Sequence, residues 1–144
     1  MSRALGGVSV FALQFVRVVG ARVIATTPTA EKAERLSGLG SPNVIKYTEI
    51  ADWDARTREL TDGRGVDCVV EIGGPGTIAM SLKALAVGGH VSLIGASLSS
   101  SGAGFDPLLL TGGGITLASL SVGRLDNYSE WVTPREVKIL DQRK

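Results

Sequence analysis

The 144-residue sequence contains one cysteine, Cys68, and one histidine, His90. A single cysteine forms no intramolecular disulfide, so we expect a reducing, cytoplasmic compartment. A zinc site needs three or four ligands, which one cysteine, one histidine and scattered carboxylates do not supply, so we expect no metal site. We interpret Cys68 as a small core residue of a strand and His90 as a half-exposed strand end. No nucleophile accompanies His90, and we assign no catalytic residue.

The sequence also lacks an excess of charge and a long apolar run. Lys and Arg total 15 against 14 Asp and Glu, which leaves no electrostatic footprint for nucleic acid. No apolar run is long enough to cross a bilayer, so we expect no membrane partner. With 44% apolar and 20% charged residues, the chain is long enough for one core and too short for two typical domains.

Glycine is abundant, at 19 residues, and Gly6 and Gly7 form the first pair. Apolar residues then recur at the spacing of one buried helix face, and the helix ends at Gly20. The residues of this predicted face are Val8, Phe11, Ala12, Phe15 and Val19. A helix that begins after two glycines can bind an anion with its free N–H groups. An ordinary tight turn is the alternative, since Ala4 and Ser9 stand where a G-x-G-x-x-G motif has glycines.

Strand and helix patterns then alternate along the chain. Helix patterns cover residues 29–39, 53–61 and 77–87, and strand patterns cover residues 22–26, 43–47, 66–72, 90–95 and 115–122. This alternation predicts an α/β fold with a doubly wound parallel sheet covered on both faces. Such a sheet binds ligands beyond the carboxyl ends of its strands. The glycines at residues 6–7, 73–76 and 95 are expected at that edge, which favours a nucleotide site.

The end of the second strand bears on which dinucleotide is bound. The dinucleotide fingerprint has an Asp or Glu there that binds the ribose and repels a 2′-phosphate, whereas this chain has Thr26 and Thr27. Positive charge is nearby, on Lys32, Arg35 and Lys46. The pattern favours NADP(H) over NAD(H), with Lys32 ranked above Arg35. Alternatively, these charges belong to a solvated helix face shared with Glu31 and Glu34.

Several runs resemble the cofactor domain of the medium-chain dehydrogenase/reductase superfamily, which includes zinc alcohol dehydrogenases and quinone oxidoreductases. The resemblance covers residues 4–123 and rests on the runs GGVSVFALQF, GARVIATT, EKAERL, TDGRGVDCVVEIGGPGT and LKALAVGGHVSLIG. It implies a Rossmann-like domain that carries NAD(P)H, preceded in relatives by a GroES-like domain with the substrate pocket and any catalytic zinc. The implied reaction is hydride transfer between NADPH and a carbonyl, alcohol or activated alkene.

The resemblance also implies site residues. By position, the pyrophosphate would meet Gly6, Gly7 and Val8, and the adenosine 2′ position would be surrounded by Thr27, Lys32 and Tyr47. The ribose would lie along Gly73 and Gly74, and the nicotinamide near Ile94, Gly95, Ala96 and Ser121. An alternative for Tyr47 is an aromatic residue that caps the core at a strand end.

The sequence departs from the superfamily at both ends. Only four residues stand before Leu5, where relatives have an apolar central strand, so we expect that strand to be missing or reduced to a stub. The strands that begin near residues 22 and 66 would then have no neighbour between them. We assign residues 1–123 to the incomplete cofactor domain and residues 124–144 to a polar, divergent tail.

These departures leave two alternatives to an oxidoreductase. One is a non-catalytic dinucleotide-binding module that completes itself on a partner strand. The other is an inactive, truncated fragment. The expected partner is the dinucleotide, and a small-molecule substrate is expected only if a catalytic domain is supplied. The sequence leaves open whether the chain forms a homo-oligomer.

Overall fold

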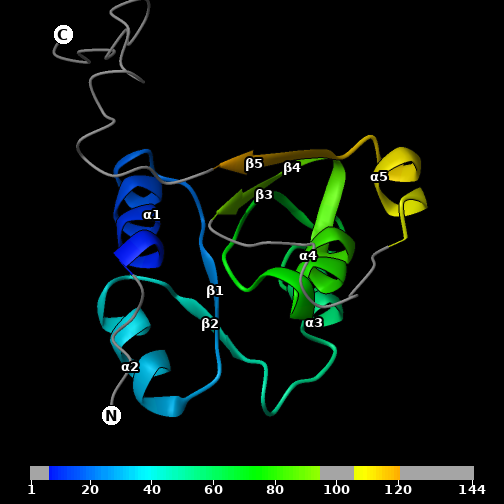
Figure 1. The fold of residues 1–144 in the computed structure, drawn as a ribbon. Helices are drawn as coiled ribbons and strands as arrows, with labels where there is room; N and C mark the ends of the chain where they lie inside the picture. The colour runs from blue at the N-terminus through cyan, green and yellow to red at the C-terminus, as the bar shows by residue number, and fades with distance from the viewer. Residues whose placement is uncertain (1–6, 95–105, 121–144) are drawn as a thin grey trace, which may run out of the picture.

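Helices and parallel strands alternate along the chain, as the sequence predicts (Figure 1). The structure is a computed structural model that describes residues 7–94 and 106–120. Its helices are α1 (Gly7–Val18), α2 (Ala30–Gly38), α3 (Trp53–Glu59), the 3-10 turn η1 (Gly74–Gly76), α4 (Ile78–Ala84) and α5 (Leu108–Gly113). Its strands are β1 (Ile24–Thr27), β2 (Asn43–Lys46), β3 (Val66–Glu71), β4 (Leu85–Ile94) and β5 (Thr116–Leu120).

The strands form two parallel sheets. One has the order β1-β2 and the other the order β3-β4-β5, and within the described residues no ladder joins β1 to β3. In Figure 1, β1 and β2 are labelled in the lower part of the view and β3, β4 and β5 above them. The expectation that the strands near residues 22 and 66 lack a common neighbour is therefore confirmed for the part of the chain that the structure describes.

Two apolar clusters hold these sheets to their helices. The first, here called the α4 core, packs Ile78 and Leu82 of α4 against Leu85 and Val91 of β4, all at most 1% exposed. The second, the Trp53 core, joins Trp53 of α3 to Ile45 of β2 and Ala84 of α4, with side chains of Ile24, Leu60 and Met80 packed around them. Because its members come from both halves of the fold, the Trp53 core links the two sheets.

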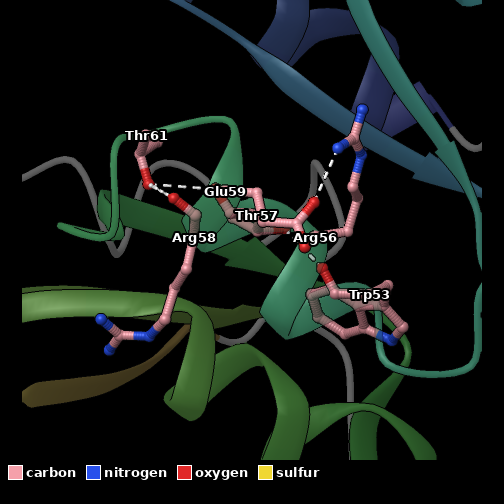
Figure 2. A network of polar contacts seen from close by, with 6 residues as sticks. All are labelled: Trp53, Arg56, Thr57, Arg58, Glu59 and Thr61. Carbon is pink, nitrogen blue, oxygen red and sulfur yellow. Dashed lines mark hydrogen bonds and ion pairs between the residues drawn. The ribbon is translucent and has the colours of Figure 1, made fainter.

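Arg58 of α3 makes a second link to the larger sheet. Its guanidinium donates to backbone carbonyls of the following turn and of the α4–β4 junction: Gly63 (3.0 Å), Arg64 (3.4 Å), Lys83 (2.8 Å) and Leu85 (2.7 Å). Figure 2 shows the Arg58 side chain extending away from the Arg56–Glu59 ion pair of the same helix, whose charged atoms lie 2.7 Å apart. The two arginines thus have different surroundings although they are two positions apart.

The boundary between α4 and β4 differs from the prediction. The sequence predicts a helix to residue 87, but α4 ends at Ala84 and β4 begins at Leu85, which is extended and pairs with Val66. The register then shifts before Cys68 pairs with His90, across a segment in which Gly88 has a φ of +76°. A short buried apolar run does not distinguish helix from strand, which explains the error.

The predicted buried face of α1 is also wrong. Phe11 and Phe15 are 62% and 68% exposed, whereas Leu13 is the buried residue of this helix. Apolar residues occur on several sides of α1, so their spacing fits more than one face, and contacts made far along the chain select Leu13. Arg17 Nη1 fixes the helix by donating to the Leu39 carbonyl at the end of α2, 2.7 Å away.

Cys68 is exposed, so its interpretation as a core residue is wrong too. Along β3, Val69 packs on the α4 core, whereas Val70 and Ile72 are exposed like Cys68. Among the described residues, helices therefore cover only one face of β3, and a strand residue is buried only on a covered face. His90 is half-buried as expected, but it lies inside β4 and its Nε2 is 3.1 Å from Ser92 Oγ.

Candidate functional site

The carboxyl ends of β1 and β2 bring Thr27 and Tyr47 together. The Tyr47 N–H donates to the Thr27 carbonyl at 3.1 Å, continuing the register in which Thr27 pairs with Lys46. The Thr27 side chain is 2% exposed, and its hydroxyl has no hydrogen-bond partner within residues 7–94 and 106–120. Tyr47 is 37% exposed, so its ring is accessible from solvent.

Lys32 lies in the first turn of α2, the helix that follows β1. Thr29 caps the helix, because its hydroxyl accepts from the Lys32 N–H at 3.4 Å. Lys32 is half-buried, and no ion pair between described residues involves it. Lys46, in contrast, pairs with Glu49 at 2.5 Å, so the structure leaves Lys32 as the better candidate for an anionic ligand at this edge.

Arg35 is exposed on α2, as are Glu31 and Glu34. These three residues therefore fit the solvated helix face that was the alternative for the whole charge run. The half-buried Lys32 differs from them in its surroundings, which supports ranking it above Arg35.

Gly7 and Val8 open α1, at an exposed helix end. A side-chain carbon added at Gly7 would meet no atom within 4 Å, so there is open space beside the first backbone N–H groups. The first turn contains no acidic residue that would compete with an anion for these groups. The residues present therefore fit a pyrophosphate. Gly6 lies outside the described residues.

Gly73 and Gly74 form the turn between β3 and α4, and each must be glycine for its own reason. A side-chain carbon at Gly73 would collide with the Thr77 side chain, and Gly74 is buried with a φ of +71°. Ile94 closes the described part of β4, next to β3. The other residues expected near the nicotinamide, Gly95, Ala96 and Ser121, lie outside the described residues.

Within the described residues, the predicted site residues thus form three groups, at the ends of β1 and β2, at the start of α1 and at the ends of β3 and β4. The third group includes one further residue that was not predicted, Glu71, a carboxylate only 4% exposed at the end of β3. The signal was present, because Glu71 follows Val69 and Val70 and stands two residues before the glycine-rich turn at residues 73–76.

The Cys68 thiol is not an activated nucleophile. Although Cys68 is exposed as a residue, partial desolvation of its thiol, followed by the charge of the neighbouring Asp67 carboxylate, raises the pKa of Cys68 above its ordinary value. The pKa of Asp67 is itself lowered, mainly because the Arg64 guanidinium donates a hydrogen bond to it. A thiol with a raised pKa carries less thiolate at neutral pH, so the structure gives Cys68 no catalytic character.

In residues 7–94 and 106–120 no three His, Cys, Asp or Glu side chains lie close enough together to hold a metal ion. Within the same residues no helix combines the length and the apolar character needed to cross a membrane. A catalytic zinc thus does not fit the described residues, and no step of the chemistry below depends on one.

Comparison with known proteins defines the class. Residues 7–135 match the family described as zinc-binding dehydrogenase. The chain is 40% identical over 90 residues to a zinc-type alcohol dehydrogenase-like protein of Schizosaccharomyces pombe. It is 38% identical over 82 residues to quinone oxidoreductase 1 of Escherichia coli. A mycobacterial protein solved in complex with NADPH superposes with a TM-score of 0.71 at 38% identity and covers 81% of this chain.

The chain belongs to the zinc-binding dehydrogenase family, within the medium-chain dehydrogenase/reductase superfamily. The matched segments comprise 62% and 57% of this chain. They span 26% and 25% of the two curated relatives and 36% of the mycobacterial structure. The matched part is the Rossmann-like cofactor-binding part that the sequence resembles.

Proposed function

We propose that this chain binds NADP(H), in preference to NAD(H), as the cofactor-binding part of an alcohol dehydrogenase or quinone oxidoreductase-like enzyme. The observation that carries the preference is the end of β1, where Thr26 and Thr27 stand in place of a carboxylate and Lys32 lies in the next helical turn. A ribose 2′-phosphate carries negative charge, which a lysine attracts and a carboxylate would repel. The solved relative that contains NADPH supports the same choice.

Each group of residues has a distinct role in this proposal. The N–H groups at the start of α1, with Gly7 and Val8, bind the pyrophosphate. Lys32 attracts the 2′-phosphate and Tyr47 lines the adenosine side. Because the Thr27 side chain is 2% exposed, its contribution is to leave this strand end uncharged rather than to contact the phosphate.

Gly73 and Gly74 allow the backbone to approach the ribose, and Ile94, with Gly95, Ala96 and Ser121, lies on the nicotinamide side. When bound, NADPH would donate a hydride to a carbonyl or activated alkene, and NADP+ would accept one from an alcohol in the reverse direction, while the protein would orient the nicotinamide. The chain's own residues are not proposed to transfer a proton. In this proposal, the substrate site is supplied by a catalytic domain and not by the described residues.

Fluorescence titration of the purified chain with NADPH and NADH tests the proposal. We expect Lys32→Ala to weaken NADPH binding by about tenfold or more, since a charged hydrogen bond contributes about 1.5–3 kcal/mol, and to change NADH binding less than about twofold. Arg35→Ala is the matched control, because Arg35 is exposed on the same helix and is expected to change neither affinity.

Thr26→Asp is the complementary variant, since Thr26 is exposed and accepts a carboxylate without burying it. It should favour NADH over NADPH relative to wild type. The preference for NADP(H) is refuted if Lys32→Ala and Thr26→Asp both leave the ratio of the two affinities unchanged. Absence of binding at millimolar concentration of either cofactor refutes the binding function itself.

A further inference from the structure

The Glu71 carboxylate is enclosed by donors that all belong to the turn and helix after β3. Its Oε1 accepts from the Gly73 N–H (2.6 Å), the Gly74 N–H (3.1 Å) and the Thr77 hydroxyl (2.7 Å). Its Oε2 accepts from the Ser81 hydroxyl of α4. None of the ion pairs between described residues includes Glu71, although its side chain is only 4% exposed. The negative charge is therefore stabilised by backbone and hydroxyl dipoles of one short segment.

These hydrogen bonds fix the conformation of the turn from its inner side. Both glycine N–H groups point at a single oxygen, which constrains two successive peptide planes. The fit is tight, because a side-chain carbon at Gly73 would lie 3.1 Å from the same oxygen. The two N–H groups are consequently not free to bind a ligand. A ligand that lies along this turn must therefore pack against the backbone of the glycines or donate hydrogen bonds to the carbonyl oxygens of the turn.

We propose that Glu71 is a positioning residue for the cofactor: its carboxylate holds Gly73 and Gly74 in the conformation that lets the backbone pass along the ribose. This inference rests on the proposed function, because that function identifies the ligand of the turn as a dinucleotide. Glu71 does not touch the cofactor, and it acts through the peptide groups of the two glycines.

The two oxygens of Glu71 permit a matched pair of variants. Glu71→Gln keeps the size of the side chain but removes the charge that both glycine N–H groups face. Ser81→Ala removes one hydroxyl from Oε2 and leaves Oε1 with its three donors. Both variants alter the same buried network, but only Glu71→Gln weakens the bonds to the glycines. Glu71→Asp is a third variant, which retains the charge on a shorter side chain.

The experiment combines proton–nitrogen NMR of the glycine-labelled full chain with NADPH titration. A carboxylate acceptor shifts amide protons downfield, so Glu71→Gln should move the Gly73 and Gly74 proton resonances upfield, while Ser81→Ala should leave them in place. Glu71→Gln should weaken NADPH binding about five- to twentyfold, which corresponds to the loss of roughly one charged hydrogen bond. Ser81→Ala should weaken it less than about threefold. Glu71→Asp should recover part of the affinity.

Either of two binding results would overturn the inference. One is a folded Glu71→Gln variant that binds NADPH within twofold of wild type. The other is an equal loss of affinity in Glu71→Gln and Ser81→Ala, which would indicate a general stabilising role. If wild type itself binds no NADPH, the proposed function fails, and unmoved glycine resonances in Glu71→Gln would separately disprove that the carboxylate holds the turn. Thermal melts of all variants identify any that do not fold.

Discussion

Replacing Arg58 with alanine removes every hydrogen bond that its guanidinium makes to the α4–β4 junction and to the turn after α3. The bond to the Leu85 carbonyl is partly buried, at 2.7 Å, whereas those to Lys83 and Gly63 are exposed. Loss of the bond to the Leu85 carbonyl should cost the most free energy. Leu85 begins β4 beside the α4 core, where water does not readily replace the lost donor.

The magnitude follows from this difference in exposure. A charged hydrogen bond in a partly buried place contributes about 1.5 kcal/mol, and each exposed one contributes about 0.5 kcal/mol. The long Arg64 bond (3.4 Å) shares Nη1 with the Gly63 bond and is not counted separately, so we expect Arg58→Ala to lower the free energy of unfolding by about 2.5 kcal/mol. For a chain of this length the entropy of unfolding is about 0.3 kcal/mol per kelvin, so the midpoint of thermal unfolding should fall by about 8 °C.

Urea denaturation followed by tryptophan fluorescence measures the change, because Trp53 is 8% exposed and lies on the same helix. Arg56→Ala is the matched control. It removes an arginine side chain two residues earlier, whose partner among the described residues is Glu59, in an exposed ion pair. The control should cost less than about 0.5 kcal/mol.

Equal losses in the two variants would refute the reasoning, since they would show that the helix and not the junction determines the effect. So would an Arg58→Lys variant as stable as wild type. A lysine ammonium has no planar fork and cannot reach the carbonyls on both sides together.

Two further predictions concern the core and the thiol. Leu82→Ala, at a position 1% exposed in the α4 core, should lower the free energy of unfolding by about 2–5 kcal/mol, measured by the same urea titration; a loss under 1 kcal/mol would contradict the packing described. Because burial and Asp67 raise the pKa of Cys68, iodoacetamide should modify the folded chain at pH 8 more slowly than the urea-unfolded chain. Asp67→Asn should speed the reaction by lowering the pKa of Cys68. If the dependence of the modification rate on pH were the same in Asp67→Asn and in wild type, the role of the carboxylate would be refuted.

The regular elements could be predicted from the sequence because their signals are local. Thr29 caps α2 within one turn, and the β-branched run before Thr27 forms a strand through its own pattern. The separation of the sheet into two parts also followed from the order of the elements. The residue contacts that decide burial are not local, and there the predictions for Phe11, Phe15 and Cys68 were wrong.

The candidate site shows the same division. Glycines and the absence of a carboxylate after β1 are visible in the sequence, so Gly7, Thr27 and Lys32 could be named in advance. Glu71 could not be assigned its role, because its donors stand at residues 73, 74, 77 and 81 and converge only when the turn and α4 fold back onto the strand end. The burial of Thr27 was equally hidden, and it makes the exposed Thr26 the position at which a carboxylate can be introduced.

Within the described residues the two sheets share no backbone ladder, and this affects folding cooperativity. Within each sheet, the hydrogen bonds of neighbouring strands must break together, but the two sheets are coupled through side chains, by the Trp53 core and by the Arg58 hydrogen bonds to the α4–β4 junction. We expect native-state hydrogen exchange to separate into two sets of protected amides, those of β1 and β2 and those of β3 to β5. The strength of their coupling, and hence whether β1 and β2 stay folded when β3 to β5 open, depends on the buried Trp53 indole together with the Arg58 guanidinium.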